Sequence, residues 1–185
     1  MRKLPASILA GAIALSALTS FALAANPRVG GAAMFADMNI VQNAMNSKDH
    51  TTLVAAVKAA GLVQALQGKG PFTVFAPVNA AFDALPKGTV EMLLKPQNKD
   101  QLTKILTCHV VATEAFSKDI ARMIDADEGE HPIKTLGGCV LTARHSGKKI
   151  TIEDENGNVA NVTIADVDQS NGVIHVIDKV LLPKM

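Results

Sequence analysis

The segment Asn171–Val180, NGVIHVIDKV, constrains the fold more than any other stretch of the 185-residue chain. It is apolar at most of its central positions, which is typical of a strand that is buried on both faces. A fold that contains such a strand needs a layer of side chains on each side of the sheet. One imidazole, His175, lies in the middle of the run, so its role decides which kinds of function are open to the protein.

The first 24 residues differ in character from the rest of the chain. Arg2 and Lys3 precede an apolar stretch without acidic residues, which ends at Ala22-Leu23-Ala24. This pattern predicts a secretory signal peptide over residues 1–24 and a secreted or periplasmic location. An uncleaved membrane anchor is the alternative, but the apolar stretch is short and ends at a cleavage pattern, so no membrane span is expected after cleavage. Residues 25–36 are small and Gly-rich and predict a flexible lead-in, which leaves residues 37–185 as one domain.

Composition excludes several classes of function. Without the signal peptide the chain has 16 basic and 17 acidic residues, because two of the 18 basic residues lie in the signal. A nearly neutral chain with no Trp or Tyr does not favour nucleic-acid binding. The motifs of serine hydrolases, zinc proteases and nucleotide-binding loops are absent from the sequence. We therefore expect no catalytic residue, no metal site and no cofactor.

The order of the expected elements predicts an α+β fold. An apolar face with helical spacing precedes Gly61, which is well placed to end that helix. From His109 onward, strand-like runs alternate with turns such as Asn156-Gly157, which is a hairpin signal. Helices therefore dominate the first part of the chain, and mainly antiparallel strands dominate the second.

The two cysteines, Cys108 and Cys139, favour one disulfide in an exported chain. Two separate buried thiols are the alternative, because the spacing alone does not decide between them.

Two of the histidines stand out. His50 and His145 lie at a probable helix start and beside a hairpin turn, so we expect them to be exposed. His109 and His175 each follow an apolar run and precede a valine. A lone histidine in a buried strand is usually a hydrogen-bonded core residue. The competing hypothesis is a ligand or metal site built around His109 and His175.

Three segments in order resemble the signatures of fasciclin-like domains. TVFAPVNAAF (residues 73–82) is similar to the first signature box of the family, and NGVIHVIDKVLLP (residues 171–183) is similar to the second. Between them, ILTCHVV resembles the Tyr-His segment of the family, with Cys108 where a tyrosine is usual. The resemblance covers residues 37–185.

The resemblance implies a fasciclin-like fold, in which a β-wedge of mainly antiparallel strands packs against a helical layer. It also implies that the two boxes form neighbouring core strands. Asn79 is expected to cap the short helix that follows it. The residues to which the resemblance assigns structural roles are Thr73, Phe75, Pro77, Asn79, Phe82, His109, Asn171, Gly172, His175 and Asp178.

Members of the family are typically secreted or surface-held modules for adhesion, and most have no catalytic activity. The resemblance therefore implies a non-catalytic exported protein that binds a protein, matrix or cell-surface partner. In some members an Asp-Ile pair before the second box contacts integrins. The matching residues here are Asp166 and Val167, followed by Asp168, but the two residues before them depart from the family pattern. We expect the contacts at loop 166–171 and in segment 117–123. The alternative is a periplasmic small-ligand or metal-binding protein that uses His109 and His175.

Overall fold

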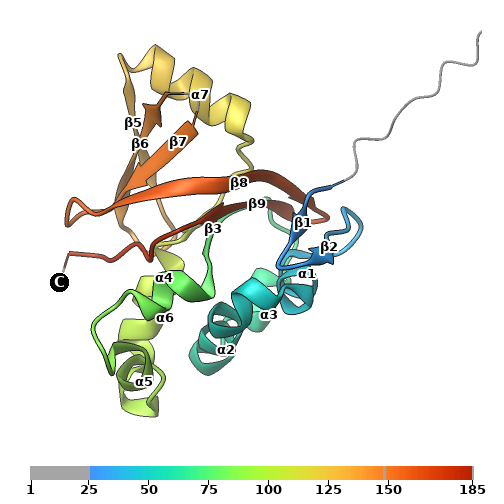
Figure 1. The fold of residues 1–185 in the computed structure, drawn as a ribbon, viewed down its shortest axis with the longest axis vertical. Coiled ribbons are helices and arrows are strands. Elements are labelled where there is room, and N and C mark those ends of the chain that lie inside the picture. The colour runs from blue at the N-terminus through green and yellow to red at the C-terminus, as the bar shows by residue number, and fades with distance from the viewer. Residues whose placement is uncertain (1–25, 148, 185) are drawn as a thin grey trace, which may run out of the picture.

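The computed structural model describes residues 26–147 and 149–184, so the predicted signal peptide lies outside the described residues. Most of the helices gather on one side of a central sheet, and a last helix lies on the other side (Figure 1). Short 3-10 turns occur at residues 48–50 and 96–98. The helices are α1 (Ile40–Asn46), α2 (Thr51–Ala60), α3 (Val63–Leu66), α4 (Asn79–Asp83), α5 (Thr89–Leu93), α6 (Lys99–Thr107) and α7 (Ser117–Ala126).

The described strands form a two-stranded hairpin and a seven-stranded sheet with the order β4-β3-β9-β8-β7-β6-β5. Only the β3–β9 pair is parallel in that sheet, and the other neighbours are antiparallel. The strands are β1 (Arg28–Val29), β2 (Ala32–Ala33), β3 (Phe72–Pro77), β4 (Val110–Val111), β5 (Glu130–Lys134), β6 (Val140–Ser146), β7 (Lys149–Glu153), β8 (Val159–Gln169) and β9 (Gly172–Ile177).

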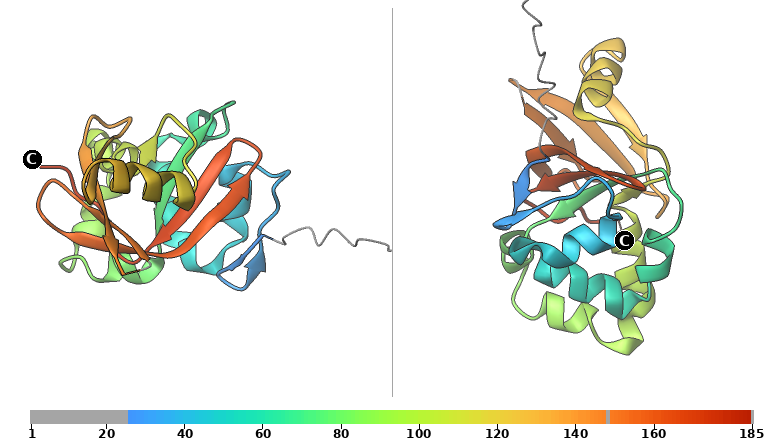
Figure 2. Two further views of the ribbon diagram at one scale, coloured as in Figure 1. Left: turned by 90° about the horizontal axis from the view of Figure 1, so that it is seen from above. Right: turned by 90° about the vertical axis from the view of Figure 1, so that its right-hand side faces the viewer.

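The sheet turns as it leaves the helical layer, so β5–β7 stand away from α1–α6 and carry α7 (Figure 2). The α+β prediction, with a helical layer and a mainly antiparallel sheet, is confirmed. The two boxes pair directly, with Phe72 opposite Gly172 and Pro77 opposite Ile177, as the resemblance implies. None of the helices in the described residues is long and apolar enough to cross a membrane.

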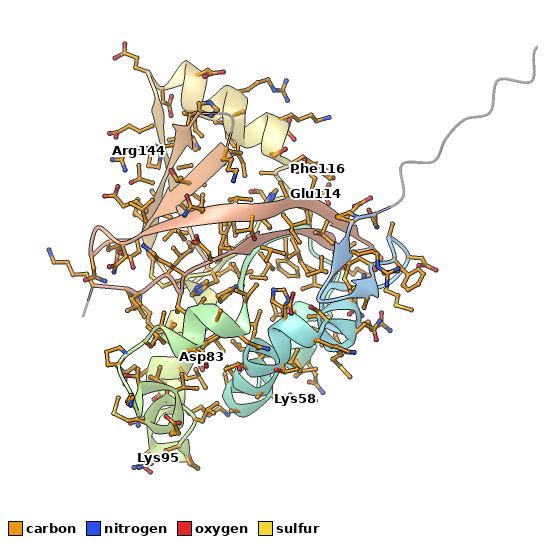
Figure 3. The ribbon with its side chains drawn as sticks, viewed as in Figure 1. Lys58, Asp83, Lys95, Glu114, Phe116 and Arg144 are labelled. Carbon is orange, nitrogen blue, oxygen red and sulfur yellow. A yellow bond between two sulfur atoms is a disulfide. The ribbon has the colours of Figure 1, made fainter. Side chains whose placement is uncertain are left out.

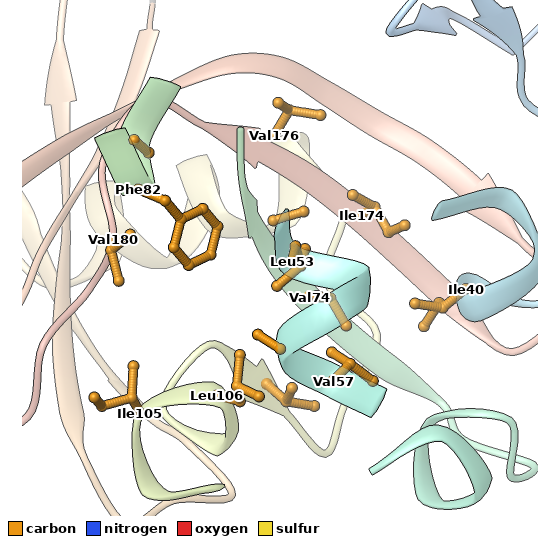
Figure 4. Close-up of a cluster of buried hydrophobic side chains, with 14 of the residues drawn as sticks. Ile40, Leu53, Val57, Val74, Phe82, Ile105, Leu106, Ile174, Val176 and Val180 are labelled. Atoms are coloured by element: carbon orange, nitrogen blue, oxygen red, sulfur yellow. The ribbon is translucent and has the colours of Figure 1, made fainter. Parts of the chain in front are cut away.

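The β3–β9 pair separates two apolar cores. Alternation along a strand sends Val74, Ile174 and Val176 to one face and Phe75 and Ile177 to the other. The first face and helices α1–α6 form the helix-side core (Figure 4). The second face, α7 and strands β5–β8 form the strand-side core. The continuous apolar run of β9 follows from this arrangement, because the strand is buried on both faces.

The prediction of a flexible lead-in at residues 25–36 is wrong for its described part. β1 and β2 pair as an antiparallel hairpin, and Val29 and Met34 are buried in the helix-side core. The side chain of Asn43 also accepts a hydrogen bond from the Phe35 N–H at 3.0 Å. Strand pairing, two buried apolar side chains and this hydrogen bond hold a segment whose composition suggests disorder.

Two local predictions at helix ends had different outcomes. Gly61 ends α2 in the left-handed region, with φ of 75°, as expected. Asn79 does not cap the helix that follows it. Its Oδ1 accepts the N–H of Thr52 at 3.0 Å, and its Nδ2 donates to the Lys48 carbonyl at 2.9 Å. Asn79 therefore caps the start of α2, because the fold places that helix end beside β3.

Candidate functional site

His175 lies at the centre of β9, opposite Phe75 of β3. The two rings stack with centroids 5.9 Å apart. Nε2–H donates to the Ala115 carbonyl at 2.9 Å, and Nδ1 accepts the N–H of Asp166 at 3.3 Å. The partners define the neutral tautomer, because a carbonyl can only accept and an amide can only donate. The side chain is fully buried, and this burial lowers the pKa of His175 although the bond to Ala115 raises it in part.

Asp166 occupies an irregularity of β8, where the register against β9 shifts between Ile164 and Val167. Its φ is 58°, a left-handed conformation that is uncommon outside glycine. The conformation directs the carboxylate to the start of α7, where Oδ1 accepts the Ser117 N–H at 2.6 Å and Oδ2 accepts the Ser117 hydroxyl. A carboxylate at a helix N-terminus stabilises the helix through its free N–H groups. Asp166 therefore fastens α7 to the sheet.

Two of the three predicted contact residues, Asp166 and Val167, make internal contacts in this fold. The Val167 side chain is fully buried in the helix-side core, so it offers no surface to a partner. The Asp166 carboxylate is engaged by Ser117, while Asp168 remains half-buried. The prediction is wrong for Val167 as a direct contact, because the bulge turns that side chain inward.

His109 follows α6 and is buried between that helix and the C-terminal segment. Nδ1–H donates to the Ile105 carbonyl at 2.9 Å, and Nε2 accepts the Leu181 N–H at 2.9 Å. Burial lowers the pKa of His109 to about 4, more than its hydrogen bond to Ile105 and the charge of Asp154 raise it. His109 thus holds the last segment of the chain against α6.

The hypothesis of a ligand or metal site at His109 and His175 finds no support in the described residues. Both ring nitrogens of each histidine are used, which leaves no lone pair for a metal. No cluster of three or more His, Cys, Asp or Glu that could hold a metal ion occurs among the described residues. His109 does reach an apolar cavity between α1, α2 and α3, but its volume of about 50 Å³ is far below that of ordinary ligand sites.

The exposure expected for the other two histidines holds for one of them. His145 is exposed, whereas His50 is buried and hydrogen-bonds the Ser47 hydroxyl at 2.8 Å. A position at a helix start does not predict exposure when the preceding turn lies against a strand. His50 also approaches the Ala76 carbonyl of β3, with Nε2 at 3.4 Å from the oxygen.

The remaining box residues make structural contacts. The Thr73 hydroxyl donates to the Thr113 carbonyl at 2.6 Å and accepts the Ala115 N–H at 2.9 Å. A Cβ at Gly172, whose φ is 149°, would lie 2.0 Å from the Phe72 carbonyl oxygen, so only glycine fits there. Phe82 is buried in the helix-side core, and Pro77 is the last residue of β3. The two remaining side chains bind backbone groups of neighbouring segments: Asn171 binds Ile40, Leu66 and Gly68, and Asp178 binds Asn161.

Cys108 and Cys139 form a disulfide with a Cα–Cα distance of 5.4 Å, which is the alternative that the sequence favours. The bridge joins the end of α6 to the turn between β5 and β6. It therefore links the helical layer to the far edge of the sheet.

Segment 112–116, which leads into α7, also belongs to the candidate site, although the sequence analysis did not include it. Glu114 and Phe116 lie on the opposite side of the sheet from the layer that carries Lys58 and Lys95 (Figure 3). Residues 112–114 are exposed, although Thr73 and His175 anchor the segment at Thr113 and Ala115. The sequence of the segment does not predict that it is exposed and anchored in this way, because the anchoring residues lie on strands elsewhere in the chain.

Comparison with known proteins agrees with the fold and with the boxes. The Fasciclin domain family model matches residues 48–183. Protein sll1483 of Synechocystis is 47% identical over 94% of this chain and 96% of its own length. The cell surface glycolipoprotein MPB83 of Mycobacterium bovis is 33% identical over 83% of this chain and 64% of its own length.

A solved structure shares the fold. It is a FAS1 domain pair from the insect cell adhesion molecule Fasciclin I, with a TM-score of 0.55 and 22% identity. The match covers 70% of this chain and 43% of that one. With the two boxes paired as neighbouring strands and the family model spanning most of the chain, this protein belongs to the fasciclin-domain family.

Proposed function

We propose that this chain is a non-catalytic, exported protein that binds a protein, matrix or cell-surface partner in adhesion. The observation that carries the proposal is the complete internal use of the box residues. The polar atoms of Thr73, His109 and His175 hydrogen-bond to backbone groups of the same chain, so these residues stabilise the fold. A scaffold of this kind leaves function to the exposed surface. The family membership and the relative named as a cell-surface protein support this function.

We place the contact surface at α7 and residues 166–171, which form the end of β8 and the turn after it. Asp166 binds Ser117, so the start of this segment lies beside the start of the helix. Lys118 and Arg122 are exposed on α7, and Ser170 is exposed in the turn. Asp168 is half-buried near the end of β8. Charged and polar side chains on a rigid helix suit recognition of a protein surface.

Chemical cross-linking in the native envelope, followed by mass spectrometry, tests this function without presuming a partner. The protein is expressed from its full sequence, and an amine-reactive cross-linker is applied to intact cells. We expect links from Lys118 to another protein, while Lys58 and Lys95 on the helical layer serve as internal controls because they are exposed as well. Links that arise only from Lys58 and Lys95, or no links to any partner, would overturn the proposal.

A further inference from the structure

The two edge strands of the seven-stranded sheet, β4 and β5, approach each other and form a seam that is closed at one end. The Leu136 N–H donates to the Val110 carbonyl at 2.7 Å, and the Gly137 N–H donates to the Thr107 carbonyl at 2.9 Å. The Cys108–Cys139 disulfide and a hydrogen bond from the Lys104 ammonium to the Gly137 carbonyl hold the same end. Among the described residues, these contacts join the sheet into a near-barrel at this end.

Beyond the closed end the two edges separate. No hydrogen bond joins residues 112–115 to β5 in the described part of the chain. A cleft of about 260 Å³ lies between them, close to the roughly 300 Å³ at the lower end of small-ligand sites. Its lining is mainly apolar and includes Phe75, Val111, Ala115, Ile120, Met123 and Ile133.

Backbone groups point into this cleft from both margins. The bond from Phe75 N–H to the His109 carbonyl makes His109 face β3, so Val110 and Ala112 face the seam. The bond from Thr135 N–H to the Cys139 carbonyl likewise turns the backbone of Lys134 and Pro132 toward the seam. The N–H groups of Ala112 and Lys134 have no partner across the seam among the described residues.

These features together suit an extended peptide. A strand that enters the seam can pair with unpaired backbone groups and place alternate side chains on the apolar floor. Pro132 lacks an N–H, so any strand that pairs along β5 can use only the groups on either side of it, which suits a short peptide better than the long continuous edge ladder of a second copy.

The charges at the margin favour an acidic residue in the peptide. Glu130 is paired with Arg144, and Asp127 is paired with His131, whereas Lys134 makes no ion pair within the described residues. Glu114 is exposed on the opposite margin and is not part of the lining. The unpaired cation at the cleft is therefore that of Lys134.

We propose that the open seam between residues 112–115 and β5 binds an extended segment of a partner protein, in which apolar residues alternate with polar ones and an acidic side chain meets Lys134. This inference rests on the proposed function, since it names the kind of partner that the exported module would bind. The closed end of the seam sets the spacing between the two margins, so the binding geometry is formed before the peptide arrives.

A peptide library tests the proposal. Random peptides of about ten residues are displayed on phage and selected against the full chain, and the enriched peptides are synthesised. We expect alternating apolar residues with an acidic residue among them, and slower hydrogen exchange at the Ala112 and Lys134 amides on binding. Methylation of alternate backbone nitrogens in the same peptides should abolish binding, because it removes strand pairing but keeps the side chains.

Two variants with matched controls locate the site. Met123→Glu should weaken binding about tenfold or more, whereas Met92→Glu on exposed α5 should leave it unchanged. Lys134→Glu should weaken binding of the acidic peptides, and Lys95→Glu should not. Thermal melting of each variant separates loss of binding from loss of folding.

Several outcomes would overturn the seam as a peptide site. They are the absence of any enriched peptide, equal binding of the methylated peptides, and protection of amides outside the seam. If the Ala112 and Lys134 amides are protected at high protein concentration without peptide, the occupant is a second copy and the proposal is wrong. The proposed function fails separately, since it depends on the cross-links from Lys118 in cells.

Discussion

The helix-side and strand-side cores share strands β3 and β9 but are completed in different ways. Helices that follow one another along the chain close the helix-side core, and buried polar side chains such as His50, His109 and Asn171 tie its segments together. The strand-side core is completed by α7, segment 112–116 and the bulge at Asp166, which are held by side chains such as Thr73 and His175. The comparison teaches that both sides combine apolar burial with buried polar side chains, and that the strand side differs because it leaves a seam open. The helix side has the larger buried apolar cluster, so we assign stability chiefly to it and binding to the strand side.

The largest expected effect tests the helix-side core. Leu106 is buried between α6 and the sheet, so Leu106→Ala should lower the free energy of unfolding by about 2–5 kcal/mol through lost burial and a cavity. Urea denaturation measures this change. Met123→Ala, at the half-buried floor of the seam, should lower stability less. Equal losses in the two variants would contradict the division between the two sides.

Acidification should destabilise the protein through its buried histidines. Unfolded His109 binds a proton near pH 6.5, while folded His109 stays neutral until about pH 4. Its contribution to stability is complete above pH 6.5 and is lost as the pH falls through 4, which amounts to about 3 kcal/mol. Burial also lowers the pKa of His50 and His175, so they act in the same direction.

Denaturant unfolding at several pH values between 7 and 4 measures this effect. His109→Gln keeps a donor and an acceptor but cannot take up the proton, so its stability should vary less with pH than that of the native chain. His145→Gln, at an exposed histidine, provides the control for the effect of the replacement itself on stability at pH 7. A native chain with constant stability between pH 6.5 and 4.5 would show that the buried histidines are not neutral as assigned.

A smaller loss of stability is expected when the hydrogen bonds of His175 on the strand side are removed. His175→Ala removes the donor to Ala115 and the acceptor for Asp166 N–H, which should lower stability by about 1–3 kcal/mol. Hydrogen exchange should also become faster in segment 112–117 than in α2, because the segment loses its anchor. A variant that melts like the native chain but loses its partner would instead assign His175 to binding.

The smallest expected effect lies at the cap of α2. Asn79→Ala should lower stability by about 1 kcal/mol, because it leaves the Thr52 N–H without its acceptor. Asn79→Asp keeps that acceptor but loses the donor to the Lys48 carbonyl, so its effect shows how much of the loss comes from the cap. Thermal melting of both variants measures these changes in stability. If hydrogen exchange instead becomes faster in α4 alone, Asn79 caps α4, as the sequence analysis expected, and not α2.

The open seam and the capping of α2 by Asn79 are two features that the sequence did not predict. The pairing of the two boxes could be expected from the resemblance to the family, and the unbroken apolar run of β9 predicted its burial on both faces. The cleft could not be expected, because it depends on where α7 and β5 lie relative to β4. Pro132 was a possible signal, since proline in a strand indicates an edge.

The sequence by itself determined the α+β order, the strand that is buried on both faces and the glycine at the end of α2, and it favoured a disulfide between the two cysteines without deciding it. These depend on residue type and on neighbours along the chain. Only the tertiary structure decided that the hairpin at residues 28–33 is ordered, that Asn79 caps α2, that Val167 points inward and that His175 of NGVIHVIDKV anchors segment 112–116. Each of these depends on a partner far away in the sequence, and a hydrogen bond or a buried contact exists only once the fold has brought the two groups together.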